Sequence, residues 1–175
     1  MEKTQYVRVE FERRFLVARD ANWHKDIEPY SKRFEDKYLS GTRLRLRVLT
    51  NSDSDERLIK LTKKELSPSP YFQTIGRILL SPEEYEIVSR LDGHSLTKVR
   101  HYLRLPGRVF SIDVFEGELA GLVLCETEAE NLEELMAVEP PPFVQSEVTE
   151  DMFFTGGNLC RLKRADLNEK LGANI

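Results

Sequence analysis

Two glutamates and an arginine alternate along a short stretch near the start of the chain. Glu10, Glu12 and Arg14 lie within Val9–Val17, a run rich in apolar and aromatic residues and free of Gly and Pro, which predicts a β-strand. Because side chains alternate between the two faces of a strand, these three share one face. The two carboxylates are then roughly 6–7 Å apart, close enough to bind one hard cation beside an anion held by the guanidinium. Taken alone, such a strand more often presents a solvated polar face.

Further carboxylates recur near the end of the predicted strands. Glu126 and Glu128 share one face of the run Leu122–Glu130, which repeats the spacing of the opening pair. Asp113 lies in the run Val109–Phe115, on the face opposite its apolar neighbours. Carboxylate oxygens are the ligands that Mg²⁺ and Mn²⁺ prefer, so these positions are candidates for a metal site.

Basic residues alternate along three other runs. Thr42–Val48 places three arginines on one face and three apolar residues on the other. Stacked arginines repel one another unless they are solvated or given an anion. The run is therefore either an exposed edge strand whose charge blocks aggregation or a track for an anion. The basic residues that share one face within each of this run and the runs Arg57–Lys64 and Leu96–Arg104 are Arg43, Arg45, Arg47, Lys60, Lys64, Lys98, Arg100 and Arg104.

The composition limits the classes of protein that this chain can represent. Lysine and arginine number 26 against 30 aspartates and glutamates, and the net charge of −4 argues against a general nucleic-acid binder. Charged residues make up 32% of the chain, and a charged interior cavity would accommodate this high share. Two isolated cysteines, Cys125 and Cys160, predict reduced thiols in a cytoplasmic protein. We expect no signal peptide and no membrane span.

Eight predicted strands with hairpin-scale connections occupy most of the first 130 residues. They are expected over Val9–Val17, Ser31–Tyr38, Thr42–Val48, Arg57–Lys64, Phe72–Leu80, Leu96–Arg104, Val109–Phe115 and Leu122–Glu130. Nearly every strand is charged on one face and apolar on the other. The pattern predicts a mainly β (α+β) fold, an eight-stranded antiparallel barrel closed into a tunnel, with a polar charged lumen and covering helices. Closure would bring the acidic first, seventh and eighth strands together.

The helix signals are few. Ser81-Pro82-Glu83-Glu84 combines an N-cap, a proline at the first helical position and a glutamate at the third, and predicts a helix to about Leu91. Shorter helices are expected over Asp20–Ile27, Leu132–Met136 and Arg164–Leu171, and Gly156-Gly157 is expected to break the α-rich tail. We expect a single domain over residues 1–175, with the barrel at about 5–130 and the tail at about 131–175.

The order of these motifs resembles that of the CYTH superfamily, the triphosphate tunnel metalloenzymes. The matching segments are Glu10-x-Glu12-x-Arg14, Leu44-Arg45-Leu46-Arg47, Lys60–Lys64, Lys98-x-Arg100, Asp113–Gly117 and Glu126-Thr127-Glu128. Each motif alone is weak, whereas their joint order is specific and covers essentially the whole chain.

The resemblance implies a tunnel that hydrolyses a small-molecule triphosphate with Mg²⁺ or Mn²⁺. The implied metal ligands are Glu10, Glu12, Asp113, Glu126 and Glu128. The implied phosphate-binding residues are Arg14, Arg43, Arg45, Arg47, Lys60, Lys64, Lys98 and Arg100. The implied catalytic residues are Glu10, Glu12, Arg14, Glu126 and Glu128. No nucleic-acid or membrane partner is expected, and the protein is expected to be a monomer or a homodimer.

Two positions depart from the family pattern. The opening motif of the family ends in a lysine that in some members is thought to help activate the attacking water, and here the position is Arg14. Arginine does not lose its proton in proteins, so Arg14 is suited instead to stabilising charge on the phosphates. Arg77 stands on the fifth strand, where related proteins often have acidic residues.

Inorganic triphosphate is the favoured substrate, because the sequence shows no additional domain and no base-recognition motif. Nucleotide or thiamine triphosphatase and class IV adenylate cyclase activities remain open, and each requires a pocket for the organic group. A non-catalytic polyphosphate or nucleotide sensor is a further alternative, which turnover would exclude. A plain barrel with a solvated charged face would be insensitive to the substitution Glu126→Gln.

Overall fold

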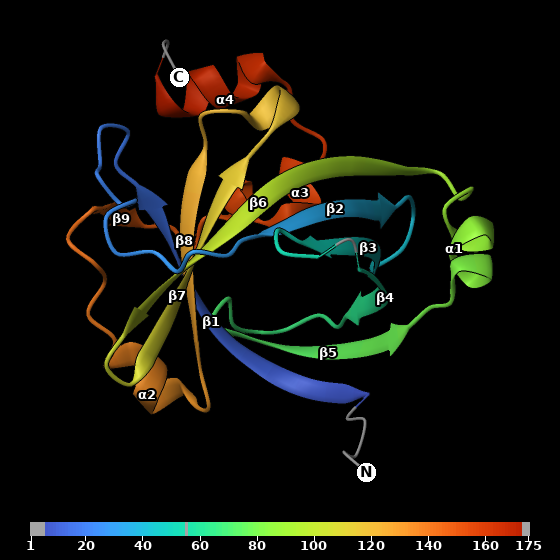
Figure 1. The fold of residues 1–175 in the computed structure, drawn as a ribbon, viewed down its shortest axis with the longest axis horizontal. Coiled ribbons are helices and arrows are strands. Elements are labelled where there is room, and N and C mark those ends of the chain that lie inside the picture. Colours follow the sequence, from blue (N-terminus) through green and yellow to red (C-terminus); the bar gives the residue numbers. More distant parts are fainter. Residues whose placement is uncertain (1–5, 55, 173–175) are drawn as a thin grey trace.

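The computed structural model describes residues 6–54 and 56–172 (Figure 1). Residues 1–5 lie outside these ranges, and with them the predicted start of the barrel and the segment for which no signal peptide is expected. Asp55, which stands between two predicted strands, and residues 173–175 also lie outside them. The described strands are β1 (Val7–Val17), β2 (Lys32–Leu39), β3 (Leu44–Asn51), β4 (Arg57–Lys64), β5 (Phe72–Leu79), β6 (Gly93–Leu105), β7 (Arg108–Phe115), β8 (Val123–Ala129) and β9 (Val144–Glu147).

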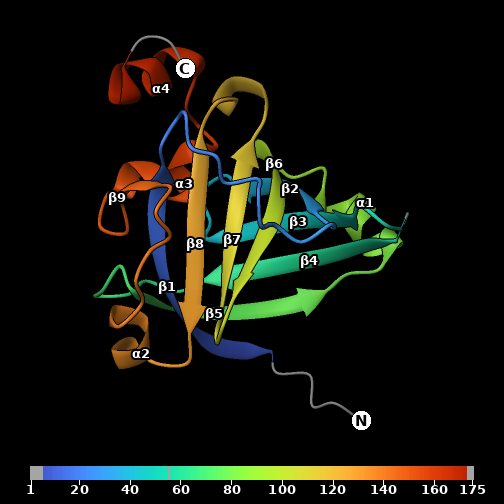
Figure 2. The same cartoon turned by 60° about the vertical axis from the view of Figure 1, so that its left-hand side comes forward.

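Eight of the strands close into an antiparallel barrel. Hydrogen bonding follows the order β5-β4-β3-β2-β6-β7-β8-β1, and β1 pairs again with β5. Figure 2 shows β8, β7 and β6 side by side, with β3, β4 and β5 on the other side of the barrel. This arrangement confirms the predicted closed eight-stranded barrel, and closure places β1 next to β8.

Strand β1 closes the barrel because it is long enough to pair with two different strands along one of its edges. Its first half, Val7–Phe11, pairs with β5, and Phe15–Val17 pairs with β9, while Phe11–Leu16 pairs with β8 on the opposite side. The sequence did not predict β9. It is only four residues long and follows the proline run, so its alternation is too short to distinguish it from a loop.

Helix α1 (Pro82–Val88) begins with the predicted capping box. The Ser81 hydroxyl accepts a hydrogen bond from the backbone N–H of Glu84, and the Glu84 carboxylate accepts one from the backbone N–H of Ser81. The helix ends at Val88, before the predicted limit at Leu91. The exposed Leu91 side chain makes no contribution to a buried face that would extend the helix.

Two outer surfaces of the barrel are covered in different ways. Tyr85 and Val88 of α1 pack against a cluster on the outside of β3 and β4. The segment before β2 covers the other surface, where Trp23 and Ile27 pack against a cluster that includes Phe110. The predicted helix over Asp20–Ile27 is wrong, because this segment is non-helical and Ile27 forms an isolated β-bridge with Leu103 of β6.

The tail after β8 is folded from short helices. They are α2 (Leu132–Met136), α3 (Gly156–Leu159) and α4 (Arg164–Leu171), with a single 3₁₀ turn, η2 (Met152–Phe154), before α3. A second 3₁₀ turn, η1 (Gly117–Leu119), lies outside the tail, between β7 and β8. The prediction that Gly156-Gly157 breaks the tail is wrong, because both glycines lie within α3. A methyl group on Gly156 would overlap the hydroxyl of Tyr38, so the close approach of α3 to β2 requires glycine there.

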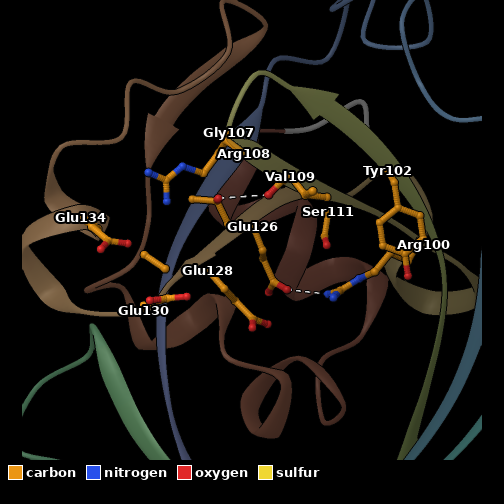
Figure 3. A pocket seen from close by; sticks show the side chains of 12 residues that line it. Arg100, Tyr102, Gly107, Arg108, Val109, Ser111, Glu126, Glu128, Glu130 and Glu134 are labelled. Carbon is orange, nitrogen blue, oxygen red and sulfur yellow. Dashed lines mark hydrogen bonds and ion pairs between the residues drawn. The ribbon is translucent and has the colours of Figure 1, made fainter.

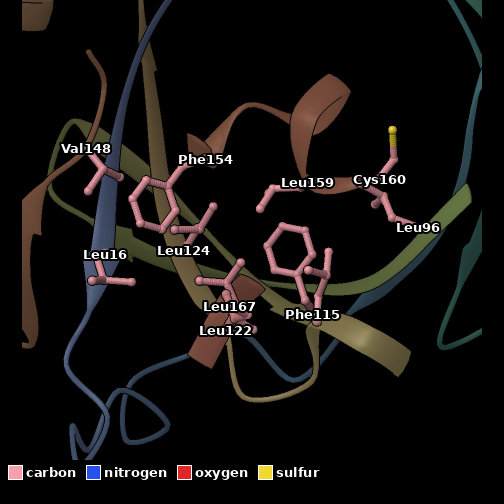
Figure 4. Packing of buried hydrophobic residues seen from close by; sticks show 11 residues of the cluster. Leu16, Leu96, Phe115, Leu122, Leu124, Val148, Phe154, Leu159, Cys160 and Leu167 are labelled. Carbon is pink, nitrogen blue, oxygen red and sulfur yellow. The ribbon is translucent and has the colours of Figure 1, made fainter. Parts of the chain in front are cut away.

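The largest apolar cluster fills one end of the barrel. Leu16, Phe115 and Leu124 are on the inner face of β1, β7 and β8, and they pack against Phe154 and Leu159 of the tail (Figure 4). The lumen is therefore charged over only part of its length, because the C-terminal elements plug the other end with an apolar core. Among the described helices, none is long and apolar enough to cross a membrane.

Candidate active site

The register of β1 and β8 brings the two predicted glutamate pairs together. Glu12 lies directly opposite Glu128, and Arg14 directly opposite Glu126. Residues paired in this way project from the same face of a sheet, here the face that lines the lumen. Asp113 joins this face from β7, which pairs with β8. The three acidic strands, β7, β8 and β1, are therefore neighbours in the closed barrel, as the sequence predicted.

Glu10, Glu12 and Glu128 form an acidic group on this wall. Burial, together with the negative charges of Glu10 and Glu12, raises the pKa of Glu128. All three have cationic partners. Arg14 Nη2 is 2.5 Å from a Glu12 oxygen and Arg77 Nη2 is 3.1 Å from a Glu10 oxygen. The exposed Arg8 pairs with Glu10 and lies 3.8 Å from a Glu128 oxygen. Across residues 6–54 and 56–172, no three carboxylate, imidazole or thiol groups are arranged as a ready metal site.

Glu126 is a buried carboxylate shared by two arginines. Arg14 Nε donates to one oxygen at 3.0 Å, and Arg100 Nη2 donates to the other at 2.6 Å. Burial alone would raise the pKa of Glu126, but Lys98, Arg100 and Arg14 hold it well below its usual range. Both Glu126 oxygens are therefore already occupied by guanidinium donors.

Asp113 is fully buried and pairs with Arg100 and with one further cation, Lys98. Arg100 donates to both of its oxygens at 2.6 Å, and Lys98 donates to the same carboxylate. Burial lowers the pKa of Lys98, and the charge of Asp113 opposes that shift. Asp113 and Glu126 thus fix Arg14, Lys98 and Arg100 in one ionic network.

Asp36 is a buried residue of the tunnel that sequence reasoning missed. Arg47 donates to its two oxygens at 2.5 and 2.6 Å, in the bidentate geometry typical of strong ion pairs. Burial would raise the pKa of Asp36, but Arg47 and Arg45 lower it to about 2. The sequence alone does not show that Asp36 pairs with Arg47. The pairing follows from the register of β2 and β3, which places the two residues directly opposite each other.

Three of the predicted phosphate-binding residues remain without a carboxylate partner in the described structure. The Arg45 Nε–H is buried and donates to no acceptor, and among the described residues no ion pair involves Lys60 or Lys64. Burial and the charge of Arg77 lower the pKa of Lys60 to about 8. Burial likewise lowers the pKa of Lys64. These cations lie together on β3 and β4, and we call this surface, with Arg77 of β5, the basic wall.

Arg43 and Arg77 are placed differently from what their sequence positions indicated. Arg43 precedes β3, is exposed, and pairs with Glu65 at 2.9 Å, so its charge already has a carboxylate partner. Arg77, noted in the sequence only as a departure, lies directly opposite Thr62 and thus faces the lumen. Its exposed fraction of 31% shows that the guanidinium reaches solvent-accessible space.

A cavity of about 630 Å³ lies beside the acidic group. Arg100, Glu126 and Glu128 point into it from β6 and β8, and Tyr102 and Ser111 complete this side (Figure 3). The outer part of the lining comes from the β6–β7 turn and from the segment that leads into α2 (Figure 3). The cavity gives solvent and small molecules access to two of the carboxylates.

Fold and site together define a class of protein, a closed antiparallel tunnel with carboxylates on one wall and, on another, cations that mostly lack a carboxylate partner among the described residues. A curated inorganic triphosphatase from Nitrosomonas europaea is 34% identical to this chain over 155 residues, which span 81% of this chain and 90% of that protein. The chain therefore belongs to the family of this inorganic triphosphatase. No family model matches the sequence.

Solved structures share the same fold. The crystal structure of an inorganic triphosphatase superposes with a TM-score of 0.57 at 25% identity, covering 86% of this chain and 93% of the other. A candidate adenylate cyclase from Bacillus halodurans superposes with a TM-score of 0.55 at 12% identity. The superposition covers 85% of this chain and 100% of the other. The second likeness concerns the fold alone.

Proposed function

We propose that this protein hydrolyses inorganic triphosphate to pyrophosphate and phosphate. The observation that carries the proposal is the division of charge in the tunnel, in a chain from an inorganic triphosphatase family. Arg45, Lys60 and Lys64 have no carboxylate partner among the described residues, so an anion would compensate their charge. A linear triphosphate offers several negative oxygens to such a wall.

The proposed cofactor is Mg²⁺ or Mn²⁺, bound by Glu10, Glu12 and Glu128. Their hard oxygen donors suit either ion, and the repulsion that raises the pKa of Glu128 would be relieved by a cation. When bound, the ion would neutralise charge on the phosphate oxygens. The proposed role of Glu126 and Asp113 is to position Arg14, Lys98 and Arg100, because both carboxylates already accept hydrogen bonds from these cations.

The proposed reaction is in-line attack of water on a terminal phosphorus. The bond between that phosphorus and its bridging oxygen breaks, the electron pair leaves with pyrophosphate, and the water proton passes to solvent or product. The basic wall holds the substrate, and Arg14 stabilises charge that develops on the phosphoryl oxygens. The apolar plug formed by the tail closes one end of the tunnel, so the substrate enters from the opposite end.

Phosphate release from inorganic triphosphate, with Mg²⁺, Mn²⁺ or EDTA, tests the proposal. Glu128→Gln removes one proposed ligand, and because the Glu128 side chain is 48% exposed the variant should still fold. We expect metal-dependent release that falls at least roughly a hundredfold in this variant. Glu133→Gln on the exposed first turn of α2 is the matched control and should behave as wild type. Absence of release from the wild type would refute the proposed function.

An organic triphosphate is the second candidate substrate, and the cavity beside Glu126 and Glu128 favours it. Its 630 Å³ would accommodate a base or a similar ring next to Tyr102. ATP and thiamine triphosphate in the same assay distinguish these substrates. Triphosphate binding without release of phosphate would instead indicate the non-catalytic sensor.

The superfamily, the cellular location and the assembly of the protein are further parts of the proposal. The motif order and the shared tunnel fold support membership of the CYTH superfamily. Cys125 and Cys160 are both buried free thiols, which supports a reducing, cytoplasmic location. The proposed assembly is a monomer or a homodimer.

A further inference from the structure

Three polar side chains form a row across the basic wall. Arg45 of β3 lies directly opposite Thr62 of β4, and Thr62 lies directly opposite Arg77 of β5. Directly opposed residues in an antiparallel sheet have their Cβ atoms about 4.5–5.5 Å apart and project from the same face. The Thr62 hydroxyl is therefore flanked by two arginines inside the lumen.

All three side chains carry a buried polar atom without a hydrogen-bond partner in the described structure. These atoms are Arg45 Nε, Thr62 Oγ1 and Arg77 Nε, and Thr62 is only 1% exposed. A buried polar group that lacks a partner destabilises the folded protein, so native structures rarely keep one. Three in adjacent positions indicate that one acceptor shared by all of them is missing.

The surrounding charges indicate what that acceptor is. Arg77 contacts Glu10 through Nη2 alone, and Arg45 pairs with no carboxylate in the described ranges. Lys60 and Lys64 flank Thr62 two residues away on either side along β4, which places them roughly 7 Å from it along the tunnel. An acceptor among these cations must be an anion with several oxygens.

We propose that Arg45, Thr62 and Arg77 bind the central phosphoryl group of the substrate, with Lys60 and Lys64 holding the groups on either side. This inference rests on the proposed triphosphate substrate and assigns its position along the tunnel. Thr62, which lies within the Lys60–Lys64 segment but had no implied role, and Arg77, which lies outside the recognised motifs, thereby become specificity determinants. The row favours a linear chain of at least three phosphates, because a shorter chain cannot occupy the row and both lysines.

Thr62→Val provides the sharper test, because binding and stability should change in opposite directions. Valine removes the unpaired hydroxyl at nearly constant volume, so the melting temperature without ligand should stay the same or rise. The KM for inorganic triphosphate should rise roughly tenfold, since the variant loses a hydrogen bond to a charged group. Thr74→Val, on the outer face of β5, is the matched control and should leave KM unchanged.

Arg77→Gln tests the other end of the row. It should raise the KM for inorganic triphosphate by at least roughly tenfold, whereas Arg33→Gln, on an exposed arginine that pairs with Glu116 outside the barrel, should not. Arg77→Lys keeps a charge beside Glu10 but lacks the planar fork, and should recover only part of the loss. Full recovery by lysine would show that charge alone is needed and would overturn the assigned hydrogen bond.

The wild type and the variants separate the two proposals. No turnover by the wild type refutes the proposed function itself. Turnover by the wild type, with KM within about twofold of it in both Thr62→Val and Arg77→Gln, overturns the phosphoryl-binding row and leaves the function standing. A raised KM in both variants, with Thr62→Val at least as stable as the wild type, supports the row.

Discussion

At the scale of single residues, buried carboxylates decide which cations of the tunnel are available to a ligand. Asp36 binds Arg47, and Asp113 and Glu126 bind Lys98, Arg100 and Arg14. These ion pairs hold the guanidinium groups in fixed geometry inside the barrel, as preorganised binding of a polyanion requires.

Asp36→Asn should destabilise the protein strongly. The variant leaves Arg47 buried without its carboxylate, and removal of one partner of a buried pair typically costs about 3–5 kcal/mol. Urea denaturation near neutral pH measures the change in free energy of unfolding. Glu35→Gln, at the exposed neighbouring position, should change it by less than about 1 kcal/mol. Equal effects of the two substitutions would contradict the structural role of Asp36.

The pH dependence of stability should reflect the same pair. Because the pKa of Asp36 is lowered from 3.8 to about 2 in the folded protein, its ionised form contributes stability above about pH 4. That contribution, about 2 kcal/mol, is lost as the pH falls from about 4 to about 2. The gap between wild type and Asp36→Asn should therefore narrow over this range, and a constant gap would argue against the assignment.

Deprotonation of Lys60 should weaken triphosphate binding at alkaline pH. Its pKa is lowered to about 8, so the side chain is charged below that pH and loses its proton above it. A bound anion favours the charged form, and the KM for triphosphate should therefore rise as the pH increases through about 8. Lys60→Arg keeps the charge and should remove this part of the profile. Ionisation of the substrate is common to both proteins and cancels in the comparison.

At the scale of elements, the contact between α3 and β2 fixes the plug on the barrel. Gly156→Ala places a methyl group against the Tyr38 ring, and overpacking of this kind costs roughly 1–3 kcal/mol. Gly157→Ala is the matched control, because its methyl group would lie 4.0 Å from Tyr38, at ordinary contact distance. Thermal denaturation should show a lower melting temperature for the first variant and an unchanged or higher one for the second.

A second substitution tests whether this contact is the cause. Tyr38→Phe removes the hydroxyl that Gly156→Ala meets, so the double variant should be more stable than the sum of the single effects indicates. Simple additivity would mean that the loss in Gly156→Ala has another origin.

At the scale of the whole molecule, barrel and tail share one apolar core. Leu159→Ala removes a buried side chain from that core and should lower the free energy of unfolding by about 2–5 kcal/mol, in a single cooperative transition. Leu91→Ala, at an exposed position after α1, should have little effect. A separate early transition in Leu159→Ala would show that the tail unfolds independently of the barrel.

The sequence by itself determined the eight strands of the barrel, its closure and the assignment of charge to inward faces, but not β9. It could do so because alternation of charged and apolar residues is a local signal with the period of a strand. The capping box of α1 is local in the same sense, since Ser81 and Glu84 are only three residues apart. The predicted helix over Asp20–Ile27 failed because a short segment adopts whatever conformation its packing against the barrel allows.

Only the tertiary structure decided which charged residues pair with one another. Asp36 meets Arg47, and Glu126 meets Arg14 and Arg100, because strand register brings together residues that are distant in sequence. Register depends on the summed packing of whole strands, which no single motif encodes. The register of β3, β4 and β5 likewise places Thr62 between two arginines. The apolar plug forms because residues of the tail pack against the apolar inner surface at one end of the barrel.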